Sequence, residues 1–381
     1  MRVLRVIFNS GEDEVNERMR YVATENLCPG MISQKCIYDE NGRRLLAANH
    51  EITENLIYAL KRIDFPGLYI YDKFSPYEKL GDFYPLSRQK SAGKALREMN
   101  LDAIIYYATD MVEELANQDQ NYVELSYLNQ NNHDVYNHSI NVAMLSAVIG
   151  FGLGMPREQV EELALSAMLH DIGKTMVPRD ILYKPGRYTS EEYEVMKQHS
   201  QFGYDMLYDN PRVTVNARCG VLFHHENSDG SGYPRGLTNP SIPLFARIIH
   251  VCDVYDAMVQ KRVYKEAKNP ADVLEYMMEQ AGIMFDYRVM DTFLRVVVVY
   301  PVGTDVVLSD GRVARVIANN PEDMFRPVVM VKSTMEEIHL DQESGENPLY
   351  ITETEQIYHE GDGLGKTAEA AFEESAFEHQ M

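Results

Sequence analysis

Histidines and aspartates are concentrated in one part of the 381-residue chain. Seven of the eleven histidines lie between His133 and His250. Neutral imidazole and carboxylate together suit divalent iron, manganese, zinc or nickel. Five histidines and three aspartates form an ordered series of candidate ligands: Asp134, His138, His170, Asp171, His199, His224, His225 and Asp253. Eight such groups exceed what one ion needs, so the series predicts two ions bridged by a carboxylate, an arrangement that favours phosphoester displacement.

The candidate ligands stand on segments with helical sequence patterns. Asp134 and His138 are four residues apart, so both would project from one face of a helix. Apolar spacing and capping signals predict three further helices, over residues 158–170, 189–199 and 243–260. His170 would end the first of these, His199 would close the second, and Asp253 would lie within the third.

Each of these residues has an ordinary explanation when it is taken alone. A lone histidine on an apolar helix is more often a core or surface residue than a ligand, and Asp253 alone would be typical of a capping or salt-bridged residue. The set is more informative, because several apolar helices each carry a histidine or aspartate where an apolar residue is expected. Burying that many polar groups without partners would be costly, and a metal centre removes this cost.

The sequence around these residues resembles a known family. Residues 170–174 (HDIGK) are similar to the signature of the HD superfamily of metal-dependent phosphohydrolases. Residues 224–226 (HHE) and 229–236 (DGSGYPRG) resemble the signature of its HD-GYP subfamily, and the flanking segment 246–257 agrees with it. The resemblance covers residues 120–300 or so, about half of the chain.

This resemblance implies a bacterial cyclic di-GMP phosphodiesterase with an all-α fold and two or three divalent ions, iron first and manganese as the alternative. The eight residues above would be the ligands, with Asp171 bridging two ions. Asp134 stands where three-metal members have a glutamate, which puts a third ion in doubt. Lys174 would act with Asp171 in catalysis and face the scissile phosphate. The substrate contacts would be Gly232, Tyr233, Pro234, Arg262 and Lys265.

The chain divides into three regions, and its predicted fold class is mainly α. Residues 1–100 predict a small α/β (α+β) accessory domain. Residues 101–300 predict the all-α HD-type catalytic domain. Residues 301–381 predict a short β-rich extension with an acidic tail.

Local patterns predict several elements outside the candidate site. Alternating residues around Asn41-Gly42 predict a hairpin over residues 31–46, followed by a helix after Thr53 and a strand over residues 67–71. Residues 101–116 predict a helix. Near the C-terminus, residues 302–317 predict two strands and residues 327–331 a third.

Composition narrows the classes of partner and the compartment. The chain has 36 basic and 58 acidic residues, a net charge of −22, and therefore lacks the basic footprint expected for polymeric nucleic acid or anionic membranes. It shows neither a long apolar run nor a signal peptide pattern, and its four cysteines form no CxxC pair. These features predict a cytoplasmic protein. The expected partners are cyclic di-GMP and either a second copy of the chain or a GGDEF-type signalling protein.

Two alternatives to cyclic di-GMP hydrolysis stay open. In the first alternative, the chain would be a catalytically weak cyclic di-GMP receptor or protein-interaction module. In the second it would hydrolyse another phosphoester, such as a related cyclic dinucleotide or a nucleoside triphosphate. The complete ligand set favours an enzyme over a receptor, and the Gly232-Tyr233-Pro234 loop argues against triphosphates.

Overall fold

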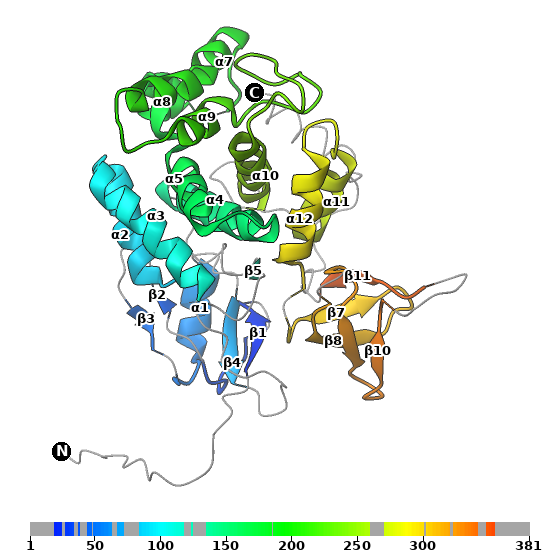
Figure 1. Cartoon of the computed structure of the whole chain (residues 1–381). Coiled ribbons are helices and arrows are strands. Elements are labelled where there is room, and N and C mark those ends of the chain that lie inside the picture. The colour runs from blue at the N-terminus through cyan, green and yellow to red at the C-terminus, as the bar shows by residue number, and fades with distance from the viewer. Residues whose placement is uncertain are drawn as a thin grey trace, which may run out of the picture.

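The computed structural model shows a mainly helical protein, as the sequence predicts (Figure 1). Asp134, Arg262 and Lys265, which the sequence places in the site, lie outside the described residues. The structure describes residues 19–24, 27–33, 37–38, 44–47, 49–62, 67–71, 84–117, 123–124, 135–184, 186–259, 270–300, 302–320, 323–341 and 348–354.

The N-terminal elements are two antiparallel strand pairs and a helix, grouped apart from the other helices in Figure 1. The helix follows Thr53, whose hydroxyl oxygen accepts a hydrogen bond from the Leu56 N–H at 3.3 Å, as the sequence predicts. The predicted hairpin pairing is present, and its turn lies outside the described residues. These elements are β1 (Met19–Ala23), β2 (Ile37–Tyr38), β3 (Arg44–Leu46), α1 (Glu54–Arg62) and β4 (Gly67–Tyr71), with β1 paired to β4 and β2 to β3.

The helical body contains all of the described candidate ligands. The helices predicted over residues 101–116, 158–170 and 243–260 are present within two residues of their expected ends. Its elements are α2 (Leu86–Arg97), α3 (Leu101–Ala116), α4 (Val135–Gly152), α5 (Arg157–Leu169), a 3-10 turn (Ile172–Met176), α6 (Arg179–Leu182), α7 (Ser190–Lys197), α8 (His199–Leu207), α9 (Val215–Phe223), α10 (Leu244–Val259), α11 (Pro270–Glu279) and α12 (Tyr287–Val296).

The prediction for residues 189–199 was half right. Thr189 and Glu192 form the predicted capping box at the start of α7, with side chain and backbone bonded in both directions. The helix then ends at Lys197 instead of His199, and His199 is the first residue of α8. The chain turns between the two helices, so His199 is presented at a helix start.

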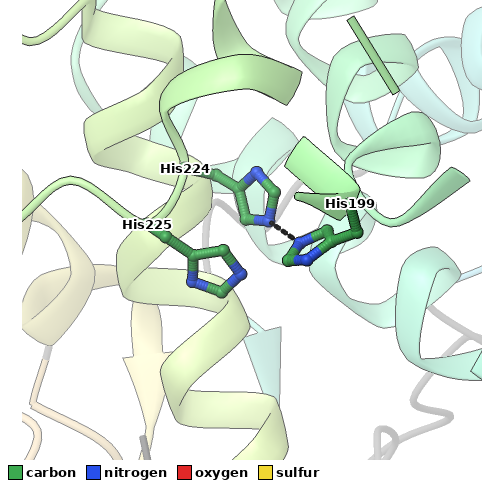
Figure 2. A group of neighbouring side chains, drawn as sticks. All are labelled: His199, His224 and His225. Atoms are coloured by element: carbon green, nitrogen blue, oxygen red, sulfur yellow. Dashed lines mark hydrogen bonds between the residues drawn. The ribbon is translucent and has the colours of Figure 1, made fainter. Parts of the chain in front are cut away.

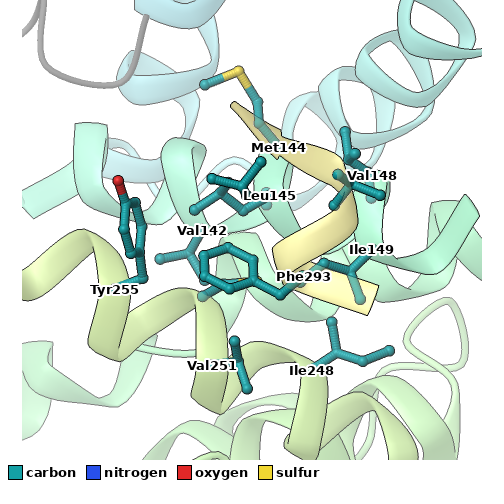
Figure 3. Packing of buried hydrophobic residues seen from close by; sticks show 14 of the residues in the cluster. Val142, Met144, Leu145, Val148, Ile149, Ile248, Val251, Tyr255 and Phe293 are labelled. Atoms are coloured by element: carbon teal, nitrogen blue, oxygen red, sulfur yellow. The ribbon is translucent and has the colours of Figure 1, made fainter. Parts of the chain in front are cut away.

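Helices α4 and α10 form the centre of the core. Both carry apolar residues on every side, so both are buried almost throughout, unlike an amphipathic surface helix. Figure 3 shows Val142 and Leu145 of α4 packed with Val251 of α10 and Phe293 of α12. A polar side chain in the middle of α4 or α10 is therefore buried inside the protein.

The C-terminal elements form a five-stranded antiparallel sheet in the order β10-β9-β8-β7-β11. The strands predicted over residues 302–317 and 327–331 are present, whereas β10 and β11 were not predicted. Alternate residues of β7, β8 and β9 face the continuous hydrophobic core. The elements are β7 (Asp305–Leu308), β8 (Val313–Ala318), β9 (Val328–Val331), β10 (Glu337–His339) and β11 (Ile351–Thr354), preceded by the parallel pair β5 (Val123–Glu124) and β6 (Val297–Val298).

Asp286 connects three parts of the helical body. One carboxylate oxygen caps α12 by accepting from the N–H groups of Arg288 at 2.9 Å and Val289 at 3.0 Å. The other accepts from the side chains of Asn239 at 2.6 Å and Arg247 at 2.7 Å. Burial alone would raise the pKa of Asp286, but these hydrogen bonds outweigh it and lower the pKa.

Asp286→Ala should therefore destabilise the protein by about 2–4 kcal/mol, because it removes a helix cap and leaves a partly buried arginine unpaired. Urea unfolding measures this change. Asp291→Ala is the matched control, since Asp291 pairs with exposed Arg295 along α12. The loss of this pair should cost less than about 0.5 kcal/mol. Equal losses in the two variants would contradict the connecting role of Asp286.

Candidate metal centre

Three of the predicted ligand histidines are oriented by the same kind of hydrogen bond to the backbone. In each, Nδ1 donates to the carbonyl oxygen three residues earlier, in the last turn of a helix, where carbonyl oxygens lack an intrahelical partner. A histidine whose Nδ1 carries the proton leaves Nε2 unprotonated and able to bind a metal. The bonds join His170 to Ala167 at 2.7 Å, His199 to Met196 at 2.8 Å and His224 to Val221 at 2.7 Å.

The free nitrogens of these histidines point toward one another. The Nε2 atoms of His199 and His224 are 3.3 Å apart, and Figure 2 shows both rings and that of His225 turned toward a common space. Asp171 lies between the histidines, with one oxygen 3.6 Å from His199 Nε2 and the other 3.5 Å from His170 Nε2. Asp171 therefore faces two histidines from different helices.

Asp253 of α10 completes the arrangement from the opposite side. Its Oδ1 lies 2.9 Å from His138 Nε2 and 3.8 Å from His170 Nε2. All seven described candidate ligands thus meet, and their ligand atoms form three overlapping groups in which the atoms lie within 4.8 Å of one another. The groups are His199, His224 and His225; His138, His170 and Asp171; and His170, His224 and Asp253.

Two buried atoms without a hydrogen-bond partner indicate that a metal suits this cluster. Among the described residues, His170 Nε2 and Asp171 Oδ1 are buried and have no hydrogen-bond partner. Such atoms are costly to bury unless an ion or water completes their bonding. Because nitrogen and carboxylate donors at these separations suit a divalent ion, the histidine and aspartate groups could bind metals.

The charge states also suit metal binding. Burial alone would raise the pKa of Asp171, but Lys174, whose Nζ lies 2.6 Å from Asp171 Oδ2, and the nearby imidazoles hold it well below its usual range. Burial lowers the pKa of His199 to about 4 and also lowers the pKa of His224 and His225. At neutral pH the Asp171 carboxyl group is therefore an anion and these three imidazoles are neutral, as ligands must be.

His138 is held by a carboxylate that the sequence analysis did not identify as functional. Asp256 is fully buried on α10, and its oxygens accept from His138 Nδ1 at 2.6 Å and Asn141 Nδ2 at 2.9 Å. The bond to Asp256 directs Nε2 of His138 toward Asp253. Two signals were available: Asp256 follows Asp253 by one helical turn in a mostly apolar helix, and it lies in the segment 246–257 that resembles the family.

His138 gives the metal-free protein a specific pH dependence. Burial would lower the pKa of His138, but Asp253 and Asp256 outweigh it and raise the pKa from 6.5 to about 9. The resulting stabilisation is complete below the unfolded value and is lost as pH rises through about 9. At about 1.4 kcal/mol per pKa unit, the loss is about 3 kcal/mol.

We therefore expect the unfolding free energy of chelator-treated protein to fall between about pH 6.5 and about pH 9.5. Urea titrations at the two pH values measure the fall. His138→Gln, which cannot titrate, should show a smaller fall over the same range. Equal falls in the two proteins would contradict the assignment of charge to His138.

The loop that carries Gly232 and Tyr233 is attached directly to the ligand histidines. The Tyr233 N–H donates to the His225 carbonyl at 3.1 Å, and the two rings stack with centroids 4.7 Å apart. Glu226, buried and also missed as a functional residue, accepts from the N–H groups of Arg235 at 2.7 Å and Leu237 at 2.8 Å. Two buried bonds to one carboxylate fix the loop beside the metal groups.

Gly232 is required where the loop approaches its neighbours most closely. A Cβ atom there would lie 2.3 Å from the backbone nitrogen of Asn227 and 2.4 Å from the His225 carbonyl oxygen. Neither backbone atom can move without shifting the ligand segment itself. Gly232 and Tyr233 therefore lie beside His225 at one side of the cluster, and Pro234 follows them in the same loop.

Gly232→Ala should lower the unfolding free energy by about 1–3 kcal/mol and weaken metal binding, because the added methyl group must displace this backbone. Gly93→Ala in α2 is the matched control, since the added Cβ would make only ordinary contacts of 3.6 Å or more, with side chains of α4. This change should stabilise α2 by about 0.5–1 kcal/mol. Thermal unfolding and metal titration measure both effects. If Gly232→Ala changed neither the unfolding free energy nor metal binding, the close approach of Gly232 to the backbone of the ligand segment would be refuted.

The comparison with known proteins agrees with this geometry. Residues 121–289 match the family model described as HD domain. This segment is similar to HD domains. It contains every described candidate ligand, and the match confirms the resemblance drawn from the HDIGK and GYP motifs.

Curated relatives of this chain have cyclic dinucleotides in their names. The chain is 37% identical over 229 residues to a cyclic di-GMP phosphodiesterase of Pseudomonas aeruginosa, covering 59% of this chain and 55% of the relative. It is 42% identical over 153 residues to the cyclic di-GMP phosphodiesterase response regulator RpfG of Xanthomonas campestris, covering 40% of each chain. It is 32% identical over 158 residues to the 3'3'-cGAMP-specific phosphodiesterase 2 of Vibrio cholerae, covering 41% of this chain and 30% of the relative.

The chain thus spans about half or less of the length of these relatives. The relatives named here differ from one another in the cyclic dinucleotide that their names give. Among the described residues, no helix has both the length and the apolar content needed to cross a membrane.

Proposed function

We propose that this chain is a metal-dependent phosphodiesterase that hydrolyses cyclic di-GMP to the linear dinucleotide pGpG, with GMP as the product of a second cut. The observation that carries the proposal is the convergence of seven histidine and aspartate ligands, brought from five separate stretches of sequence. Relatives that are named as cyclic di-GMP phosphodiesterases support the choice of substrate.

The ligand set supports two divalent ions, iron first and manganese as the alternative. One ion would be held by His199, His224 and His225, and the other by His138, His170 and Asp253, with Asp171 facing both groups. Asp134 would extend the second group toward a third ion. When bound, such ions supply Lewis-acid stabilisation of charge on a phosphodiester and a water activated near neutral pH.

The protein's own residues would hold the substrate and control charge around it. Lys174 is partly exposed and its ammonium stays beside Asp171, so it can also donate to a phosphate oxygen at the same place. Tyr233 stacks on His225, so its ring covers one side of the cluster and would exclude water there. Arg262 and Lys265 would grip phosphate and guanine, on the sequence resemblance alone.

One specific observation favours a second candidate substrate. A relative with 32% identity over 158 residues is named for 3'3'-cGAMP, which differs from cyclic di-GMP in one base. A receptor with little turnover is the other alternative, and the complete ligand set disfavours it. A cytoplasmic location and a second copy or a GGDEF-type protein as partner belong to the proposal on the sequence resemblance.

Anaerobically purified protein reconstituted with iron or manganese should convert cyclic di-GMP to pGpG, as measured by chromatography of the products. Asp171→Ala should reduce turnover by about 10³-fold or more, because it removes the group that faces both metal sites. Tyr233→Ala should reduce it far less, by about tenfold, because the ring only borders the cluster. Similar losses would show that the roles are assigned wrongly, and a wild-type protein that binds cyclic di-GMP without product would support the receptor.

A further inference from the structure

A lysine on α7 faces the substrate loop and was not predicted from the sequence. Tyr193 and Lys197 are four residues apart on α7, so they share one face of the helix. Lys197 Nζ lies 5.0 Å from the centroid of the Tyr193 ring and 5.9 Å from that of Tyr233. The two tyrosine rings meet edge to face at 6.3 Å. The ammonium group is therefore held over two aromatic faces, an attractive arrangement for a cation.

This lysine is close to the candidate metal centre. Tyr233 stacks on His225 with their centroids 4.7 Å apart. Because both separations, 5.9 Å and 4.7 Å, are measured to the Tyr233 ring, Lys197 Nζ can be at most 10.6 Å from the His225 ring centroid. A cation at that distance is outside the first layer of metal ligands and within reach of a dinucleotide bound to them.

The start of α7 is fixed, so the position of Lys197 is set in advance. The Glu192 carboxylate accepts from the Thr189 N–H at 2.7 Å and from Lys184 Nζ at 2.5 Å. The Thr189 hydroxyl oxygen accepts in return from the Glu192 N–H at 3.3 Å. The helix therefore has little freedom to carry Lys197 away from Tyr233.

The partner of Lys197 leaves the cation available. Lys197 pairs with Glu194, whose side chain is 66% exposed, whereas the Lys197 side chain is only 24% exposed. An ion pair whose acid lies in solvent is weak and exchanges readily. Lys174, by contrast, pairs at 2.6 Å with the buried Asp171. Lys197 is thus a cation beside Tyr233 whose solvent-exposed partner a bound phosphate can replace.

We propose that Lys197 binds the non-reacting phosphate of the cyclic dinucleotide, with Tyr193 and Tyr233 holding its ammonium in place. This inference rests on the proposed function. A cyclic dinucleotide has two phosphodiesters, and when one lies at the metal groups the other must lie away from them and needs its own positive charge. The protein is acidic overall, at −22, so such a charge has to be supplied locally.

Steady-state kinetics with cyclic di-GMP on the reconstituted full chain tests the proposal. Lys197→Gln should raise KM by about tenfold with a much smaller change in kcat, since a charge-assisted contact away from the reacting bond is lost. It should also make kcat/KM less sensitive to added salt. Lys197→Arg, which keeps the charge, should recover most of the affinity.

Lys94→Gln on α2 is the matched control, because Lys94 also forms a helical ion pair, with Glu98, and lies on another helix. If the wild type turns over cyclic di-GMP and Lys197→Gln has the same KM and salt dependence as Lys94→Gln, the role of Lys197 is refuted and the proposed function stands. If the wild type neither binds nor hydrolyses cyclic di-GMP, the proposed function fails, and the role of Lys197 fails with it.

Discussion

The structure depends on one electrostatic constraint, the burial of several ionisable side chains inside an apolar helical core. His170 and His224 are fully buried, and His199, Asp171, His138 and Asp253 nearly so. An isolated charge or unpaired polar group in such surroundings costs several kcal/mol. The cluster avoids much of this cost by alternating imidazoles with two carboxylates, so that each anion faces neutral or cationic nitrogen. A bound cation would satisfy the atoms that remain without a partner.

The fold meets this constraint with a few repeated local arrangements. Helix ends supply free carbonyl oxygens that orient His170, His199 and His224, so the same break that ends a helix also positions a ligand. The two buried helices, α4 and α10, carry His138 and Asp253 inside the protein because almost no side of either helix faces solvent. Asp256 then holds the candidate ligand His138, and Glu226 holds the loop that carries Tyr233, each by hydrogen bonds. Positioning and stability therefore come from the same contacts.

Much of the local structure could be predicted from the sequence, because it depends on neighbours along the chain. The cap at Thr189, the strands around Ser309-Asp310-Gly311 and the long helix containing Asp253 all have signals within a few residues. The ligand set was predicted as a list, since histidines on apolar helices are unusual. Its convergence could not be derived from spacing, because it depends on how α4, α8, α9 and α10 pack.

The missed features share one physical cause. Asp256 acts through His138, which is 118 positions away, and Glu226 acts through a loop that folds back on it. The helix predicted to reach His199 ends earlier, and the Met196 carbonyl oxygen accepts from the His199 side chain. Lys197 becomes notable only when Tyr233 is brought beside it. Each of these roles is set by tertiary contacts, whereas propensity and periodicity describe only the local chain.

The most direct test of a two-metal centre is a manganese titration of the metal-free protein, followed by electron paramagnetic resonance. If His138, His170, His199, His224, His225, Asp171 and Asp253 form adjacent sites that share Asp171, two Mn²⁺ ions should bind per chain and give a spin-coupled spectrum. Binding of one ion or none, with only the six-line spectrum of isolated Mn²⁺, would contradict the paired centre and with it the proposed phosphodiesterase.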